Sequence, residues 1–157
     1  MDFIVKLLGI NQDSSTVKKV NFEDIQSIIS NSRNEYILIN TLPLQEQNCL
    51  IKNTIQCSKE EGIINANLNK NLGIIIYGKN ANEKKVLEKY SQLLDLGFTR
   101  VFIYPGGLFE WLLLQDIYGA DEFPTTIQEL DILKYRPQSH LSKSYLLTDV
   151  EDRKSVV

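Results

Sequence analysis

The sequence predicts an α/β fold with a mainly parallel sheet of four or five strands and helices on both faces. Apolar β-branched runs of strand length alternate with helical patterns, and the connections between them are short. The central run is residues 74–77 (Ile-Ile-Ile-Tyr), which stops at Gly78 and leads into a charged helical stretch. This pattern is typical of a buried strand that feeds a helix. The loop between such a strand and its helix is where α/β proteins place their sites.

Some of the elements before this strand are predicted more clearly than others. Asn21 precedes a helix, because Glu23 and Asp24 supply acids to its first turn and apolar residues follow at helical spacing. A continuous apolar strand follows at 36–42 and is stopped by Pro43. Residues 51–55 suggest a short strand, and 58–70 either a short helix or an irregular crossing.

The elements after the central strand are clearer. Residues 82–96 carry apolar side chains at helical spacing, and Gly97 stands where a C-cap glycine belongs. A β-branched and aromatic strand covers 98–104 and ends sharply at Pro105, where a tight turn with two glycines begins. The helix from about 108 to 118 is apolar on all faces, so we expect it to be largely buried.

Composition limits the partners. The chain has 157 residues, 43% of them hydrophobic, and a net charge of -3, which fits one domain and excludes the basic footprint of nucleic-acid or anionic-membrane binding. No apolar run reaches the roughly 20 residues of a membrane span, and the first residues lack the features of a signal peptide. We therefore expect an intracellular protein, cytoplasmic or within a large assembly. The heavy use of Ile, Asn and Lys hints at an AT-rich genome, such as that of a protist or a large virus, and at an organelle complex or virus particle.

Three segments are predicted along the chain. An N-terminal edge segment covers 1–19, a core domain covers 20–119, and a C-terminal extension covers 120–157. The end of this extension is polar with isolated apolar points, and Tyr145, Leu146 and Leu147 form a small anchor that could add onto a neighbouring protein. The alternative is a disordered terminus.

Four sequence blocks, in order along the chain, carry a resemblance to a known family. They are 38–42 (Leu-Ile-Asn-Thr-Leu), 50–55 (Leu-Ile-Lys-Asn-Thr-Ile), 75–78 (Ile-Ile-Tyr-Gly), and 96–101 (Leu-Gly-Phe-Thr-Arg-Val) followed by Gly106, Gly107 and Trp111. On these blocks the chain resembles the rhodanese-like family over about two thirds of its length. The resemblance implies a rhodanese fold. It also implies that a catalytic Cys, which carries sulfur as a persulfide, belongs directly after the strand at 74–77.

The residues that depart from the family pattern stand at the positions that carry the family's chemistry. Gly78 occupies the Cys position, and Glu83 stands where a cation is common. The predicted vestigial active-site loop consists of Gly78, Lys79, Asn80, Ala81, Asn82, Glu83 and Lys84. Asn40, Leu42 and Leu50 replace an Asp, an Arg and a His that the family uses as polar braces. Without a thiolate, neither sulfur transfer nor phosphatase chemistry has a starting point.

The resulting hypothesis is a non-catalytic rhodanese-like pseudoenzyme that acts as a protein-interaction or structural module, without cofactor, metal or small-molecule substrate. The alternatives are a sulfurtransferase or phosphatase-like enzyme that uses a displaced Cys49 or Cys57, or acid/base chemistry at Glu83. Neither cysteine is expected to begin a helix, and their spacing matches no zinc signature. A further alternative is a loop that still binds an anion through its N–H groups.

Overall fold

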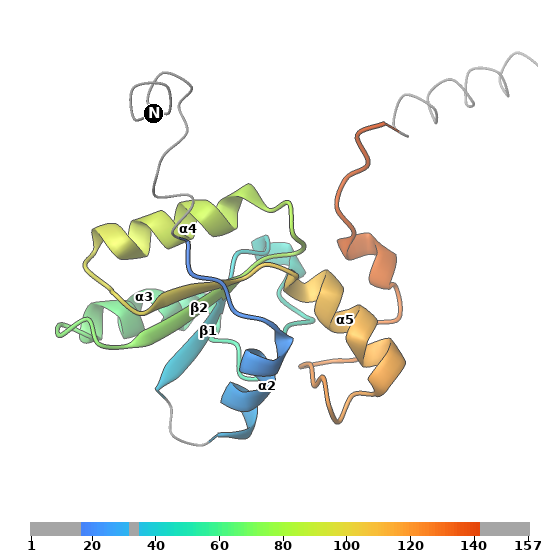
Figure 1. Ribbon diagram of the computed structural model, residues 1–157, viewed down its shortest axis with the longest axis horizontal. Helices are drawn as coiled ribbons and strands as arrows, with labels where there is room; N and C mark the ends of the chain where they lie inside the picture. Colours follow the sequence, from blue (N-terminus) through green and yellow to red (C-terminus); the bar gives the residue numbers. More distant parts are fainter. Residues whose placement is uncertain (1–16, 32–34, 142–157) are drawn as a thin grey trace, which may run out of the picture.

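The computed structural model describes residues 17–31 and 35–141, which form a parallel sheet covered by helices on both faces (Figure 1). The strands are β1 (Tyr36–Asn40), β2 (Gly73–Tyr77) and β3 (Val101–Tyr104), in the order β1-β2-β3. Ile75 pairs with Leu38 on one side and with Phe102 on the other. Every residue of β2 is buried, as the sequence predicts for the central strand.

The number of strands differs from the prediction of four or five. The described residues contain three, and two further segments pair with the sheet edges only through single bridges, Thr54 with Leu38 and Lys19 with Ile103. The first segment is short because Asn53 turns the chain with a φ of 70° just before Thr54. The second is short because the helix cap at Asn21 follows almost at once. Both edges are therefore covered, but neither segment extends into a strand.

The described residues contain four α-helices. They are α2 (Phe22–Ser30), α3 (Cys57–Ala66), α4 (Lys84–Asp95) and α5 (Gly107–Tyr118), with 3-10 turns η2 (Leu44–Glu46) and η3 (Ile132–Tyr135). Asn21 accepts hydrogen bonds from the backbone N–H groups of Glu23 and Asp24, and the Asn21 N–H donates to the Asp24 carboxylate. This capping box fixes where α2 begins. The uncertain stretch after residue 57 is a helix.

Two cores lie on opposite faces of the sheet because alternate strand residues point to opposite sides. Ile75 and Tyr77 pack with Trp111 of α5 on one face. Ile74 and Ile76 pack with the helices α3 and α4 on the other face. Within the described ranges, no helix is long and apolar enough to cross a membrane.

The chain after α5 continues into the first of these cores. The ring centroids of Phe123 and Trp111 are 5.0 Å apart. The Nε1 of Trp111 donates to the Pro124 carbonyl at 3.1 Å. Ile51 and Thr125 form an antiparallel bridge, and Tyr135 is buried in the same core. The core thus extends past the predicted boundary at residue 119. The predicted anchor of Tyr145, Leu146 and Leu147 lies outside the residues that the structure describes.

Candidate functional site

The candidate site is the loop that connects β2 to α4, where the sequence predicts a vestigial active site. It starts at Gly78, and Glu83 is the N-cap residue of α4. Two other features meet it at the carboxyl edge of the sheet, namely Asn40 at the end of β1 and the Gly106-Gly107 turn at the start of α5. In a parallel α/β protein this edge is the expected place for a site.

The residues around Gly78 leave no room for a side chain at this position. A Cβ atom there would lie 2.7 Å from Cγ2 of Val86 and 3.0 Å from both Cβ and Cγ of Glu83. The Gly78 carbonyl oxygen also accepts a hydrogen bond from the N–H of Leu108 at 2.9 Å. The volume in which a nucleophilic side chain would begin is therefore filled by the first turn of α4.

The turn at Gly107 packs directly against this loop. Gly107 has a φ of 64°, and a Cβ atom on it would lie 2.6 Å from the Gly78 oxygen and 3.1 Å from the Asn80 nitrogen. The N–H of Phe109 donates to the Lys79 carbonyl at 2.9 Å. A residue with a side chain would separate the turn from the loop, so glycine is required here for both conformation and contact.

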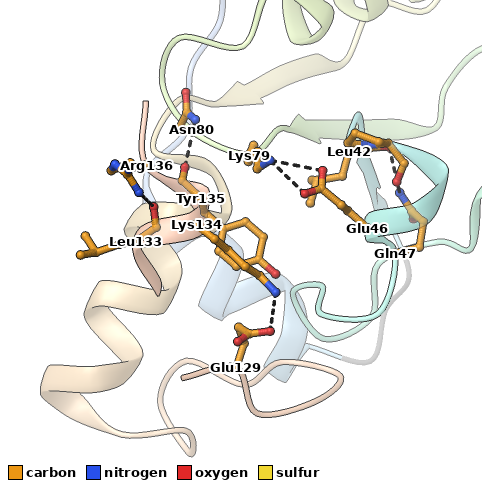
Figure 2. A network of polar contacts seen from close by, with 11 residues as sticks. Leu42, Glu46, Gln47, Lys79, Asn80, Glu129, Leu133, Lys134, Tyr135 and Arg136 are labelled. Atoms are coloured by element: carbon orange, nitrogen blue, oxygen red, sulfur yellow. Dashed lines mark hydrogen bonds and ion pairs between the residues drawn. The ribbon is translucent and has the colours of Figure 1, made fainter. Parts of the chain in front are cut away.

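Asn80 joins the loop to the C-terminal segment, as Figure 2 shows. Its side chain is 8% exposed, and its Nδ2 donates to the backbone carbonyl of Tyr135 at 2.9 Å. Its Oδ1 accepts from the N–H of Asn82 at 2.9 Å, and its carbonyl accepts from the N–H of Glu83 at 3.4 Å. These N–H groups bond within the loop, so they do not converge on an outside ligand.

Lys79 and Glu46 form an ion pair across the edge of the sheet (Figure 2), with Nζ to oxygen distances of 3.0 and 3.3 Å. Glu46 comes from η2, which follows β1. The basic side chain nearest the start of the loop is thus held by a carboxylate. With Glu83 beside Gly78, the local charge does not favour an anion.

Asn40 still acts as a polar brace, and the expectation that its exchange removes one is wrong. Asn40 and Gln47 exchange reciprocal amide hydrogen bonds of 3.0 and 2.8 Å. The Asn40 Oδ1 also accepts from the Leu42 N–H at 3.0 Å. A neutral amide pair therefore replaces the charged brace that the resemblance implies. Leu42 and Leu50 are buried in the core, so apolar packing replaces the other two braces.

The two cysteines are free and occupy different environments. Cys49 is buried, its Sγ lies 3.6 Å from the Ile127 carbonyl, and burial raises the pKa of its thiol. Cys57 is the first residue of α3, so the expectation that neither cysteine begins a helix is wrong for this one. It borders a shallow hollow with Glu60 and Lys89, which form an ion pair. Neither is part of the loop at Gly78.

Sequence reasoning missed the partners that close the loop. Glu46 and Tyr135 lie 33 and 55 residues away along the chain from their partners Lys79 and Asn80, and neither belongs to a recognisable motif. The Gly106-Gly107 pair was the one available signal, because it indicates a tight turn before a helix. Among the described His, Cys, Asp and Glu side chains, no group of three is placed to hold a metal ion.

Known structures define the fold. The BH2092 protein from Bacillus halodurans is similar over 78% of this chain and 93% of its own, with a TM-score of 0.54 and 16% identity. The Alr3790 protein from Anabaena is similar over 73% and 86%, with a TM-score of 0.51 and 18% identity. RPA3614 from Rhodopseudomonas palustris, described as a possible tyrosine phosphatase, is similar over 69% and 86%, with a TM-score of 0.51 and 12% identity. No protein-family model and no curated protein matches the sequence.

A domain of the Alr3790 protein carries the description rhodanese-like. At a TM-score of 0.51 this chain shares the fold of the Alr3790 protein, and this rhodanese-like α/β fold agrees with the resemblance seen in the sequence. At these identities the likeness defines the fold alone.

Proposed function

We propose that this protein is a non-catalytic member of the rhodanese-like fold that works as a protein-interaction or structural module. The observation that carries the proposal is the state of the loop after β2. Gly78 supplies no nucleophile, and Val86 and Glu83 occupy the space that a side chain at this position would need. Sulfur transfer and thiol-based phosphate transfer both begin with a nucleophile in such a loop.

The closed state of the loop supports the same proposal. Asn80 binds the carbonyl of Tyr135, and Gly107 lies against the Gly78 oxygen. In an enzyme, the polar groups of such a loop would face a substrate. In this protein, they form hydrogen bonds with other parts of the same chain. The loop thus serves as an attachment point for the C-terminal segment. Bonds of this kind stabilise a shape that a partner can recognise.

The rival function is an enzyme that uses a displaced cysteine. Cys49 fits poorly because burial raises the pKa of its thiol, and a nucleophilic cysteine needs the thiolate form. Cys57 is better placed, since it begins α3 and is partly exposed. Its neighbours in the hollow, Glu60 and Lys89, form an ion pair with each other, and the thiol lies outside the loop at Gly78.

Turnover assays separate the two functions. The purified full chain is incubated with thiosulfate and cyanide, and separately with p-nitrophenyl phosphate, beside an active rhodanese and a tyrosine phosphatase. We expect rates equal to those without protein for the wild type and for Cys49→Ser and Cys57→Ser. Turnover by the wild type that Cys57→Ser abolishes would refute the proposal.

A Gly78→Cys variant tests the reason for inactivity. If only the nucleophile were missing, this exchange would create sulfurtransferase activity. Because Val86 and Glu83 crowd the position, we expect a less stable protein without turnover. Measurable turnover by this variant would mean that the loop keeps its catalytic geometry, and that its closed form is not a barrier to chemistry.

The partner is proposed to bind through surfaces outside the loop, with the end of the chain as one candidate. A truncation that tests this should retain Tyr135, because its backbone holds Asn80 and its ring is in the core. Deletion of residues 142–157 leaves these contacts in place. Loss of co-purifying native partners from the truncated chain would support the anchor at Tyr145, Leu146 and Leu147, and unchanged partners would exclude it.

A further inference from the structure

A groove lies between α5 and the segment that follows it. Figure 1 shows these two parts of the chain next to each other. Its volume is about 580 Å³. Leu112 and Asp116 of α5 line one wall, and Ile127, Leu130 and Ile132 line the other. The groove is separate from the loop at Gly78, and the proposed function assigns no role to it.

Apolar side chains at the groove are unusually exposed. Leu130 is 83% exposed and Ile127 47%, although both line the groove. Ile132, which also lines the groove, is partly exposed. Apolar side chains of this size, gathered around a depression, mark a surface that gains free energy when a partner covers it.

The charged residues that line the groove, Asp116 and Glu129, are both acidic. Between Val101 and Leu133 the sequence contains no Lys, Arg or His, and it contains the acids Glu110, Asp116, Asp121, Glu122, Glu129 and Asp131. In the described part of the chain, the only one of these in an ion pair is Glu129, which binds Lys134. The surface around the apolar residues therefore attracts cations and repels phosphate-bearing ligands.

The groove is already formed without a partner. Gln115 on α5 donates to the Phe123 carbonyl at 2.7 Å and to Thr125 Oγ1 at 3.0 Å. The Thr126 hydroxyl donates to the Asn48 carbonyl at 2.7 Å and accepts from the Leu50 N–H at 3.0 Å. Because these bonds fix the segment beside α5, a ligand would not have to order it. Preorganisation of this kind raises affinity.

We propose that this groove binds a basic amphipathic segment of a partner protein, an inference that rests on the proposed role as an interaction module. Apolar side chains of the partner, spaced by one helical turn, would cover Ile127, Leu130 and Ile132. Its Lys and Arg side chains would lie near Asp116 and Asp131. The terminal segments of this chain are poor candidates, because residues 142–157 hold three basic and three acidic side chains and residues 1–16 hold one and two.

The test uses a labelled helical peptide as the probe. It consists of Leu and Lys in an amphipathic pattern, with about 18 residues for five helical turns, and a matched peptide carries Glu in place of Lys. Fluorescence anisotropy with the full chain should show binding of the Lys peptide, at least about tenfold tighter than the Glu peptide. Higher salt should weaken it, because the attracting charges are exposed.

Two leucines of equal exposure provide the matched variants. Leu130 is 83% exposed and lies in the groove, whereas Leu68 is 84% exposed and lies in the turn after α3. We expect Leu130→Ser to weaken binding about fivefold or more, Asp116→Asn about threefold, and Leu68→Ser not at all. Neither leucine supports the core, so each variant should remain folded by circular dichroism.

Several results would overturn the proposal. Equal binding of the two peptides, or a loss of affinity in Leu68→Ser as large as that in Leu130→Ser, would mean that the groove does not select the ligand. A wild-type dimer in sedimentation that Leu130→Ser dissociates would mean that a second copy covers the groove. Each of these leaves the inactive loop unaffected, whereas turnover in the cysteine assays would refute the proposed function even if the peptide bound.

Discussion

Two connections leave the carboxyl edge of the sheet, one after β2 and one after β3, and they are held by different means. The loop after β2 depends on side chains, with Asn80 bound to Tyr135 and Lys79 to Glu46. The turn after β3 depends on backbone, with Gly107 pressed against the Gly78 oxygen. The comparison indicates how a loop without a nucleophile keeps its path, because the neighbouring turn and the two polar pairs hold it.

The largest effect is expected from Gly107→Ala, which tests the backbone half of this comparison. The added Cβ would meet the Gly78 oxygen at 2.6 Å, and the residue would have to keep a φ of 64°. We expect a loss of about 3 kcal/mol in the free energy of unfolding, measured by urea denaturation. Gly107→Asn separates the causes, because Asn tolerates this φ but still carries a Cβ. If Asn restores most of the stability, the close contact is not the main constraint.

A smaller loss, of about 2 kcal/mol, is expected from Gly78→Ala because its Cβ would meet Val86 and Glu83. The control is Gly62→Ala in α3, where a Cβ would meet nothing within 4 Å. This exchange should stabilise the protein by about 0.5 to 1 kcal/mol. Shortening Val86 to Ala in the Gly78→Ala background should recover part of the loss. Strictly additive effects of the two exchanges would contradict the contact.

The side-chain half of the comparison is tested by Asn80→Ala. It removes the bond to the Tyr135 carbonyl and the one that the Asn82 N–H donates. We expect a loss of about 1 to 2 kcal/mol and faster amide hydrogen exchange in η3. Lys134→Met is the matched control, because it breaks the exposed pair with Glu129 on the same segment. It should change stability by less than about 1 kcal/mol. Equal exchange rates in both variants would exclude Asn80 as the anchor.

The smallest effect at neutral pH is expected at the two tyrosines that end the strands and pair in register. The Tyr77 hydroxyl accepts from the Ile51 N–H at 3.1 Å and lies 2.6 Å from Thr54 Oγ1. The Tyr104 hydroxyl is buried without a hydrogen bond to any residue in the described ranges. At pH 7, Tyr77→Phe should cost about 1 kcal/mol and Tyr104→Phe close to nothing. Equal costs would remove this difference between the two strand ends.

The same pair predicts the response to alkaline pH. Burial raises the pKa of both phenols above the ordinary value of 10, and the nearby Glu110 carboxylate adds to the effect at Tyr104. The folded state therefore holds these protons more tightly than the unfolded state. Stability should be constant with respect to these groups below pH 10 and should fall as the pH rises above it. Urea midpoints between pH 8 and about 11 should fall less steeply in either Phe variant than in the wild type.

Much of the fold follows from local signals. The Asn21 cap, the apolar spacing in α4 and the apolar run of β2 each act within a few residues, so the sequence predicts them. The helix α3 was uncertain because its two buried residues, Glu60 and Ile64, leave little apolar periodicity. The sheet was expected to be wider because 51–55 has strand composition. A turn at Asn53 limits its pairing to one bridge.

One part of the candidate site could likewise be predicted from the sequence, and another part could not. The absence of a nucleophile at Gly78 is visible in the sequence once the strand before it is recognised. The closure of the loop is not, because it depends on Tyr135 and Glu46, which other parts of the fold bring there. The resemblance also suggested that Asn40 removes a brace. It gave no sign that Gln47 would pair with the new amide.

The buried thiol of Cys49 provides a way to measure how often the segment that ends in η3 detaches from the domain. Its sulfur lies beneath the Ile127 carbonyl, next to the bridge that joins Ile51 to Thr125. Because Cys49 is 2% exposed and its sulfur contacts this segment, we expect a thiol reagent to reach it once the segment has detached from the domain. In a Cys57→Ser background, the labelling rate of Cys49 would therefore measure how often this segment detaches. Its dependence on reagent concentration would show whether detachment or the chemical step limits that rate.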